Sequence, residues 1–375
     1  MQPKDYLLDT PLRPKFQGSY NRDFYAVLKR RVDEYFTDSG RPRRGGLTVQ
    51  IKTAGILVSY VTLYLLLISN RFTPQGTLAI AIFFGLFNVL IVFNIAHDAS
   101  HNALFKSLRI NKLFSYSFNL VGANSYLWNI THNQIHHTYP NIGDFDTDIQ
   151  QQAPLIRVSP TVPLRWYHQF QHFYAPILYL MYSVFLVFVK DFQDIGILPK
   201  KDSRLLEDRK HNTREYIIFL STKLIYYTVT IVIPFLIIDV TWQQFVFGFL
   251  VVHMIMSLFL SLVLIPVHMV DEASFDQVDR DGRINENWFL HVFKNTVDYS
   301  RKSRIANFFF GGLNTHLVHH LFPRICHTHY VELSELLRKT AKEFNYDYRE
   351  VTMIQAIASH FRLLKRMGRE ELSQA

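Results

Sequence analysis

Four apolar stretches along the chain are long enough to cross a bilayer, which takes about 20 helical residues. They cover residues 53–70, 76–96, 216–238 and 245–267. Only a few residues separate the two members of each pair, and these linkers carry almost no lysine or arginine. The pattern predicts an all-α integral membrane protein with four transmembrane helices arranged as two hairpins.

The polar segments outside these stretches are rich in lysine and arginine. Because basic segments remain in the cytoplasm, the N-terminus, the long middle section and the C-terminus are expected on the cytoplasmic side. The chain then divides into an N-terminal segment (1–52), a membrane domain (53–330) and a C-terminal helical segment (331–375). Helix-like spacing of apolar residues predicts amphipathic helices at 21–36 and 331–344. Lys223 lies inside the third stretch, from which its long side chain is expected to snorkel to the interface.

Three histidine clusters, HDASH, HNQIHH and HLVHH, stand close to the predicted membrane surface. They contain His97, His101, His132, His136, His137, His316, His319 and His320. The i, i+4 spacing within the first two clusters places two imidazoles on one helix face. Imidazole suits iron, zinc or copper, and eight imidazoles are too many for one metal. The clusters therefore predict a cytoplasmic helical cap that holds a di-metal site.

A fifth apolar stretch, residues 173–189, is also long enough to be considered a span. If it crossed the bilayer, the third histidine cluster would face the opposite side from the first two. The basic segment 190–215 would also be exported, against the usual charge distribution. We therefore expect an interfacial helix at 173–189.

The remaining histidines need separate interpretations. His268 follows the fourth span, at the level of His97, and is expected to be a ninth ligand. His253 lies fifteen residues earlier in the sequence, about 22 Å away along a helix, and fits a neutral histidine hydrogen-bonded between helices better than a ligand. His168 and His172 lack a third partner nearby and are not expected to bind metal. For His327 and His329 we expect packing roles or contacts to ligands, and for His211, His291 and His360 surface positions.

Composition adds a few limits. The chain has 375 residues, of which 49% are hydrophobic and 19% charged, so membrane spans are joined to sizeable aqueous parts. The polar, basic first fifty residues do not resemble a cleaved signal. The single cysteine, Cys326, excludes an intrachain disulfide. The net charge of +9 suits an acidic protein partner or anionic headgroups, or serves only to set the topology.

In its three clusters the chain resembles the membrane fatty acid desaturases, whose histidine boxes hold a non-haem di-iron centre. The resemblance extends from the first span to about Tyr330. The segments HHTYPNIGDFDTDI and HHLFPRICHTHY are similar to the front-end desaturases, the group that includes acyl-CoA 6-desaturases acting on linoleoyl-type chains.

This resemblance implies that the eight clustered histidines are iron ligands and that His268 is the additional histidine of the superfamily. It implies two iron ions, O2 as co-substrate, and a cis double bond formed in an acyl chain carried on CoA or on a lipid. The acyl chain of the substrate would lie in an apolar tunnel between the spans. No HPGG haem motif occurs, so electrons are expected from a separate cytochrome b5 or ferredoxin. Front-end enzymes often have glutamine where this chain has His316, which leaves the bond position open.

Iron-bound imidazoles need a partner for the second ring nitrogen, and several acidic side chains near the clusters could supply it. These are Asp98, Asp144, Asp146, Asp148 and Glu272. No catalytic residue beyond the metal centre, no organic cofactor and no nucleic-acid partner is expected. Two alternatives remain. One is a di-iron hydroxylase or ketolase acting on lipid, and the other is a metal-binding membrane receptor or carrier, although a carrier should place its histidines deep within the spans.

Overall fold

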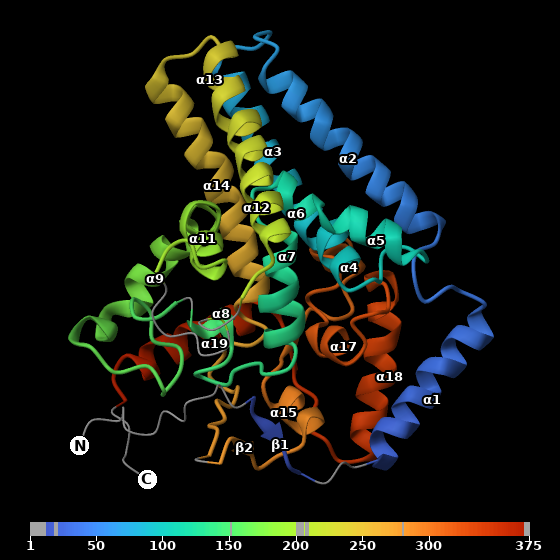
Figure 1. Cartoon of the computed structure of the whole chain (residues 1–375). Coiled ribbons are helices and arrows are strands. Elements are labelled where there is room, and N and C mark those ends of the chain that lie inside the picture. The colour runs from blue at the N-terminus through green and yellow to red at the C-terminus, as the bar shows by residue number, and fades with distance from the viewer. Residues whose placement is uncertain are drawn as a thin grey trace.

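The chain is predominantly helical in the computed structural model, which describes residues 13–18, 22–150, 152–199, 206, 210–279 and 281–370. The outermost parts of the two predicted terminal segments, residues 1–12 and 371–375, lie outside this range, as does residue 21. Long helices project from one side of a body of shorter helices, and the histidine-bearing elements lie where the two parts meet (Figure 1).

Four helices in the described part of the chain are long and apolar enough to cross a membrane. They are α2 (Leu47–Leu67), α3 (Pro74–Ile91, continued by the π-helical turn η1, Val92–Ala96, and by α4, His97–Ser100), α12 (Thr213–Tyr227, continued by η5, Thr228–Val232, and α13, Ile233–Ile237) and α14 (Trp242–Leu264). The predicted number and approximate positions of the spans are confirmed. The last span ends three residues earlier than predicted because Ile265 precedes Pro266, a position that disfavours helix. Helix α3 packs against both α2 and α14.

The fifth apolar stretch forms a bent element. It comprises η3 (Trp166–Phe170), α9 (Gln171–Leu180), α10 (Tyr182–Phe185), η4 (Leu186–Lys190) and α11 (Asp191–Asp194). The two halves meet at 61°, the geometry of a broken span or a re-entrant segment.

A buried ion pair ties this bent element to α12. The ammonium group of Lys223 is 2.9 Å from the carboxylate of Asp191 and also donates to the carbonyl oxygens of Gly122 and Val187. Lys223 is only 4% exposed, so the prediction that it snorkels to the interface is wrong. A buried charge needs a partner, and a neighbouring element supplies one that the pattern of α12 alone does not reveal.

The remaining elements form the body below the spans. They are α1 (Arg22–Ser39), α5 (Leu108–Ser115), α6 (Ser117–Leu120), α7 (Ser125–Trp128), η2 (Asn129–His136), α8 (Thr147–Gln150), α15 (Trp288–Lys294), α16 (Arg304–Phe310), α17 (His316–Leu321), η6 (His327–His329), α18 (Tyr330–Glu343) and α19 (Met353–Met367). Two short parallel strand pairs join distant segments: β1 (Lys15–Phe16) with β2 (Arg283–Ile284), and β3 (Asp298–Tyr299) with β4 (Glu350–Val351).

Helices α1 and α18, near the two ends of the chain, lie side by side in this body (Figure 1). Phe24 and Leu28 of α1 are fully buried in one apolar cluster with Leu337 of α18 and Val318 of α17. The two amphipathic helices predicted at 21–36 and 331–344 are therefore confirmed over their described residues, and their apolar faces support the short helix that carries the third histidine cluster.

Candidate metal centre

The nine histidines predicted to form one site lie together and are buried, with exposed fractions of 7% or less. Eight form two groups in which the candidate ligand atoms lie within 4.8 Å of one another. One group is His97, His101, His132 and His319, and the other is His136, His268, His316 and His320. His137 lies between them, because its ring centroid is 4.6 Å from that of His101 and 4.4 Å from that of His320.

The backbone divides the second cluster between the two groups. Residues Asn129–His136 form a π-helical segment, η2, and such insertions are frequent at functional sites. The rings of His132 and His136 stack 5.2 Å apart on one face, as their spacing predicted, yet they belong to different groups of four. With Asp148 they also form a smaller candidate group of three. A second π-helical turn, η1, directly precedes His97.

The third cluster lies on the six-residue helix α17, which is too short to be stable alone. The carboxylate of Asp298 accepts a 2.9 Å hydrogen bond from the backbone N–H of Leu317, at the start of this helix. Tyr348, near the C-terminus, donates to the other oxygen of the same carboxylate at 2.5 Å. Contacts from distant segments therefore fix the orientation of α17.

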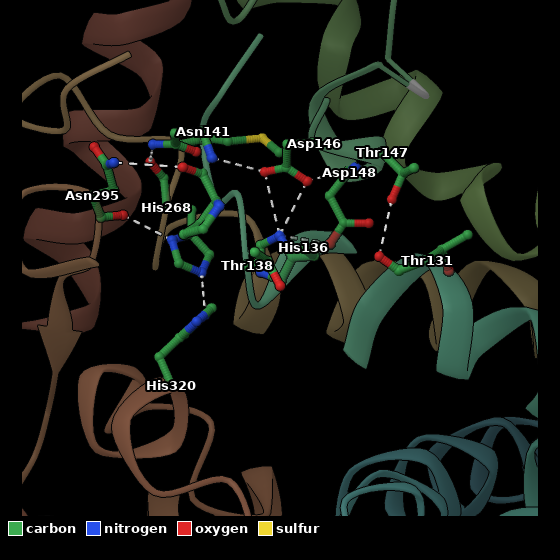
Figure 2. A network of polar contacts seen from close by, with 12 residues as sticks. Thr131, His136, Thr138, Asn141, Asp146, Thr147, Asp148, His268, Asn295 and His320 are labelled. Atoms are coloured by element: carbon green, nitrogen blue, oxygen red, sulfur yellow. Dashed lines mark hydrogen bonds and ion pairs between the residues drawn. The ribbon is translucent and has the colours of Figure 1, made fainter. Parts of the chain in front are cut away.

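Three of the histidines donate their Nδ1–H to fixed acceptors. His136 donates to the Asp146 carboxylate, with distances of 3.1 and 3.3 Å to its two oxygens. His268 donates to the backbone carbonyl of Asn295 at 2.7 Å, and His316 to that of Leu313 at 3.2 Å. Figure 2 shows His136 beside Asp146, and His268 between Asn295 and His320. These bonds leave Nε2 of each ring to serve as the ligand atom, the arrangement usual for metal-binding histidine, and Nε2 of His268 lies 2.9 Å from that of His320.

Asp146 is itself held in place by the backbone. Its oxygens accept hydrogen bonds from the N–H groups of Asn141 and Asp148 at 2.8 and 3.0 Å. Asn141 adopts a positive φ of 60° and donates its side-chain amide to the carbonyl of His268 at 2.9 Å. The loop after the second cluster is thus connected to the segment after the fourth span (Figure 2).

Many ring nitrogens in this site have no hydrogen-bond partner among the described residues. They are Nδ1 and Nε2 of His97, Nε2 of His101, His132, His137 and His319, and Nδ1 of His320. Each unsatisfied buried polar atom costs about 1–3 kcal/mol, and native proteins contain few of them. A concentration of such atoms in one place is expected where a bound ligand completes the site, and imidazole donors fit a transition metal.

The electrostatics favour neutral imidazoles at most of these positions. Burial lowers the pKa of six of them well below the usual value: His101, His132, His137, His316, His319 and His320. Burial likewise lowers the pKa of His268 to about 3. Neutral histidine is the form that binds metal. His136 differs, since burial opposes its protonation but Asp146 and Asp148 outweigh burial and raise its pKa to about 9.

Of the five acidic residues considered as histidine partners, Asp146 and Asp148 lie beside His136, at 3.1 and 3.5 Å. Asp98 lies 3.8 Å from Nδ1 of His97 but binds Nδ1 of His327 at 2.7 Å. Glu272 instead pairs with Arg362 and accepts a hydrogen bond from Ser359. Asp144 is exposed.

Two histidines expected on the surface are buried, so that prediction is wrong. His291 lies 2.7 Å from both the Asp276 carboxylate and the carbonyl of Pro140, and His360 donates to the carbonyl of Met269 at 2.7 Å. Their partners come from segments distant in sequence, so local polarity gave no signal. By contrast, His253 is hydrogen-bonded between helices as interpreted from the sequence.

The backbone carbonyls of Asn295 and Leu313, which accept from His268 and His316, could not be predicted from the sequence because every residue type carries the same carbonyl group.

His168 and His172 belong to none of the candidate metal groups among the described residues. Nδ1 of His327 lies 2.7 Å from the Asp98 carboxylate, and Nδ1 of His329 lies 3.1 Å from the hydroxyl of Tyr35.

The chain is similar to known proteins over most of its length. A family model described as fatty acid desaturase matches residues 75–352. The sn-1 linoleoyl-lipid 6-desaturase of Arthrospira platensis is 30% identical over 92% of each chain. The enzyme of the same name from Synechocystis sp. is 29% identical over 96% of this chain and 99% of its own length. The acyl-lipid (8-3)-desaturase of Physcomitrium patens is 29% identical over 95% of this chain and 74% of its own length.

Proposed function

Because this chain belongs to the fatty acid desaturase family, we propose that it introduces a cis double bond into a fatty acyl chain at a non-haem di-iron centre, using O2. The chain is a membrane oxidoreductase, and its relatives confirm the resemblance to front-end desaturases. The names of these relatives favour an acyl group carried on a membrane lipid over acyl-CoA. The proposal rests above all on nine buried histidines gathered at one place, six of which have a ring nitrogen without a hydrogen-bond partner among the described residues.

The two groups of four histidines support two metal ions rather than one. Metal-bound nitrogens lie about 2.0–2.1 Å from an ion of this size, so nitrogens that share one ion are separated by about 3–4 Å. The Nε2 atoms of His268 and His320 are 2.9 Å apart. We assign His97, His101, His132 and His319 to one iron and His136, His268, His316 and His320 to the other, with His137 between them.

Iron suits the donor set, since imidazole binds this metal well and the family implies it. When bound, iron supplies the activation of O2 that removal of hydrogen from an unactivated methylene requires. The side chains of the protein orient and shield the centre. Asp146 and the carbonyls of Asn295 and Leu313 hold three imidazoles with Nε2 directed inward, and burial of all nine histidines shields the centre from water.

The topology and the partners complete the proposal. The two pairs of spans would form hairpins, with the bent helix pair at the interface and the termini and active site in the cytoplasm, in line with the basic segments. Residues 53–330 would form the membrane desaturase domain, between terminal segments 1–52 and 331–375. A separate cytochrome b5 or ferredoxin would deliver electrons, and the net charge of +9 favours an acidic donor.

The test is expression in a host that lacks polyunsaturated lipids, supplied with defined fatty acids. We expect a new double bond near the carboxyl end of the acyl chain, located by gas chromatography with mass spectrometry, and we expect it first in the membrane-lipid fraction. A hydroxylated product without a new alkene would instead identify the chain as a lipid hydroxylase. An alkene that first accumulates in the acyl-CoA pool would overturn the choice of carrier.

A further inference from the structure

His291 of α15 is fully buried, and both of its ring nitrogens face acceptors. Nδ1 lies 2.7 Å from the carboxylate of Asp276, and Nε2 lies 2.7 Å from the backbone carbonyl of Pro140. A neutral imidazole carries one N–H and can donate to only one acceptor. His291 therefore donates from both nitrogens as the imidazolium cation, and Asp276 is the opposite charge that a buried cation requires.

The surroundings of this ring fit a positive charge. The nearest ring nitrogen and carboxylate oxygens of His291, Asp276 and Glu286 lie within 4.8 Å of one another, and Lys294 pairs with Glu286. Two carboxylates thus face two cations. The hydrogen bond from His291 also holds the pKa of the Asp276 carboxyl below its usual value, so this carboxyl stays charged.

The carbonyl that accepts from Nε2 belongs to the peptide group between Pro140 and Asn141, just after the second histidine cluster. The N–H of the same peptide group donates to Asp146 at 2.8 Å, and Asp146 accepts from Nδ1 of His136 at 3.1 Å. Figure 2 shows the part of this chain of contacts from Asn141 through Asp146 to His136. Hydrogen bonds at both ends of one peptide group fix its plane and strengthen each other. His291 thus acts on the candidate ligand His136 without touching it.

The segment that carries His291 also holds a second candidate ligand. Asn295, directly after α15, accepts from Nδ1 of His268 at 2.7 Å through its backbone carbonyl. Its side-chain amide packs against the ring of His291, with Nδ2 3.0 and 3.1 Å from the two ring nitrogens. His136 and His268 belong to the same group of four. Helix α15 has only seven residues, so contacts of this kind, rather than its own length, keep it in place.

We propose that His291 is a positioning residue of the metal centre, which aligns His136 through Pro140 and keeps α15 where Asn295 can align His268. The inference rests on the proposed function. Asp276 fixes the orientation of the His291 ring, and the bond to Pro140 transmits that orientation to the centre. Because both aligned imidazoles are assigned to one iron, loss of this bond should weaken iron binding at that group first.

Two substitutions separate the two hydrogen bonds of His291. The amide nitrogen of glutamine can occupy the position of Nε2 and keep the bond to Pro140, whereas that of asparagine occupies the position of Nδ1 and keeps only the bond to Asp276. His291→Asn is therefore expected to lower the iron content from about two ions to about one per chain, and desaturation by about 10–100-fold. His291→Gln should retain most of the iron and most of the activity. Iron is measured by elemental mass spectrometry on purified protein.

His168 supplies the matched control. It is also fully buried, and its Nε2 lies 2.8 Å from the backbone carbonyl of Pro154, but it belongs to none of the candidate metal groups among the described residues. His168→Asn removes the same kind of bond from a proline carbonyl. It should lower the thermal unfolding midpoint about as much as His291→Asn does, while its iron content stays at the wild-type value.

Asp276→Asn tests whether a metal ion, rather than a proton, lies between Asp276 and His291. An amide at this position can donate to Nδ1 of a neutral ring while Nε2 still donates to Pro140, so iron content should remain close to that of the wild type. A third metal ion per chain that this substitution removes would overturn the inference.

Three further results would also overturn it: wild-type iron content in His291→Asn, equal iron loss in His291→Gln and His291→Asn, or the same iron loss in His168→Asn. A wild-type chain that holds two iron ions but forms no alkene would contradict the proposed function alone. The iron contents of the variants would still decide whether His291 positions the centre.

Discussion

Replacement of His320 with alanine is expected to abolish desaturation while the protein remains in the membrane. His320 is 2% exposed, and its Nε2 is 2.9 Å from that of His268, within the group that also contains His136 and His316. Even the loss of a residue that only orients a ligand lowers metal affinity or activity by 10–100-fold. Loss of a ligand itself should therefore lower product formation by at least about 100-fold, measured by gas chromatography of membranes with equal amounts of protein.

His172→Ala is the matched control for that experiment. His172 is partly buried and, like His320, has an unpaired ring nitrogen, but it lies on α9 and belongs to neither group of four. The same substitution there should leave product formation within about twofold of wild type. Full activity in His320→Ala would remove this residue from the proposed site.

Asp146→Asn is expected to weaken the centre without removing a ligand. Burial alone would raise the pKa of the Asp146 carboxyl, but His136 and two backbone N–H groups outweigh it and hold the pKa below the usual value. The carboxylate therefore stays charged, accepts from His136 and strengthens that imidazole as a donor. The neutral amide cannot accept all of these bonds. Iron content and activity should fall together by about 10–100-fold, measured on the same purified sample.

Asp281→Asn makes the same chemical change at an exposed carboxylate, whose ion pair with Arg283 is 3.8 Å long and open to solvent. It should retain wild-type iron content and activity, because exposed ion pairs contribute little. If Asp146→Asn retained both as well, the orienting role of Asp146 would be disproved.

The spans were predictable because crossing a bilayer imposes a length and a composition that leave a strong local signal. The positions of α2, α3, α12 and α14 follow from that signal alone. The charge of Lys223 was visible in the sequence, but its partner was not, since Asp191 belongs to an element whose bend could not be foreseen. His291 and His360 were misjudged for the same reason, because burial of a polar side chain depends on acceptors from distant segments.

The histidine site, too, could be predicted from the sequence only in part. The spacing of the clusters indicated which residues gather together, and the structure brings all nine into two adjacent groups and the space between them. The spacing did not reveal that His132 and His136 belong to different groups of four, since that depends on the π-helical segment η2. The orienting carbonyls of Asn295 and Leu313 were equally hidden, because any residue type provides the same acceptor.

The most direct test of the central claim is the iron content of the full chain, purified in mild detergent and measured by elemental mass spectrometry against protein concentration. Eight buried imidazoles in two groups of four, with His137 between them, predict two iron ions per chain. Both should be lost from a preparation of His320→Ala or held there at reduced occupancy. A preparation that desaturates lipid while it contains no iron, or only zinc, would contradict the account.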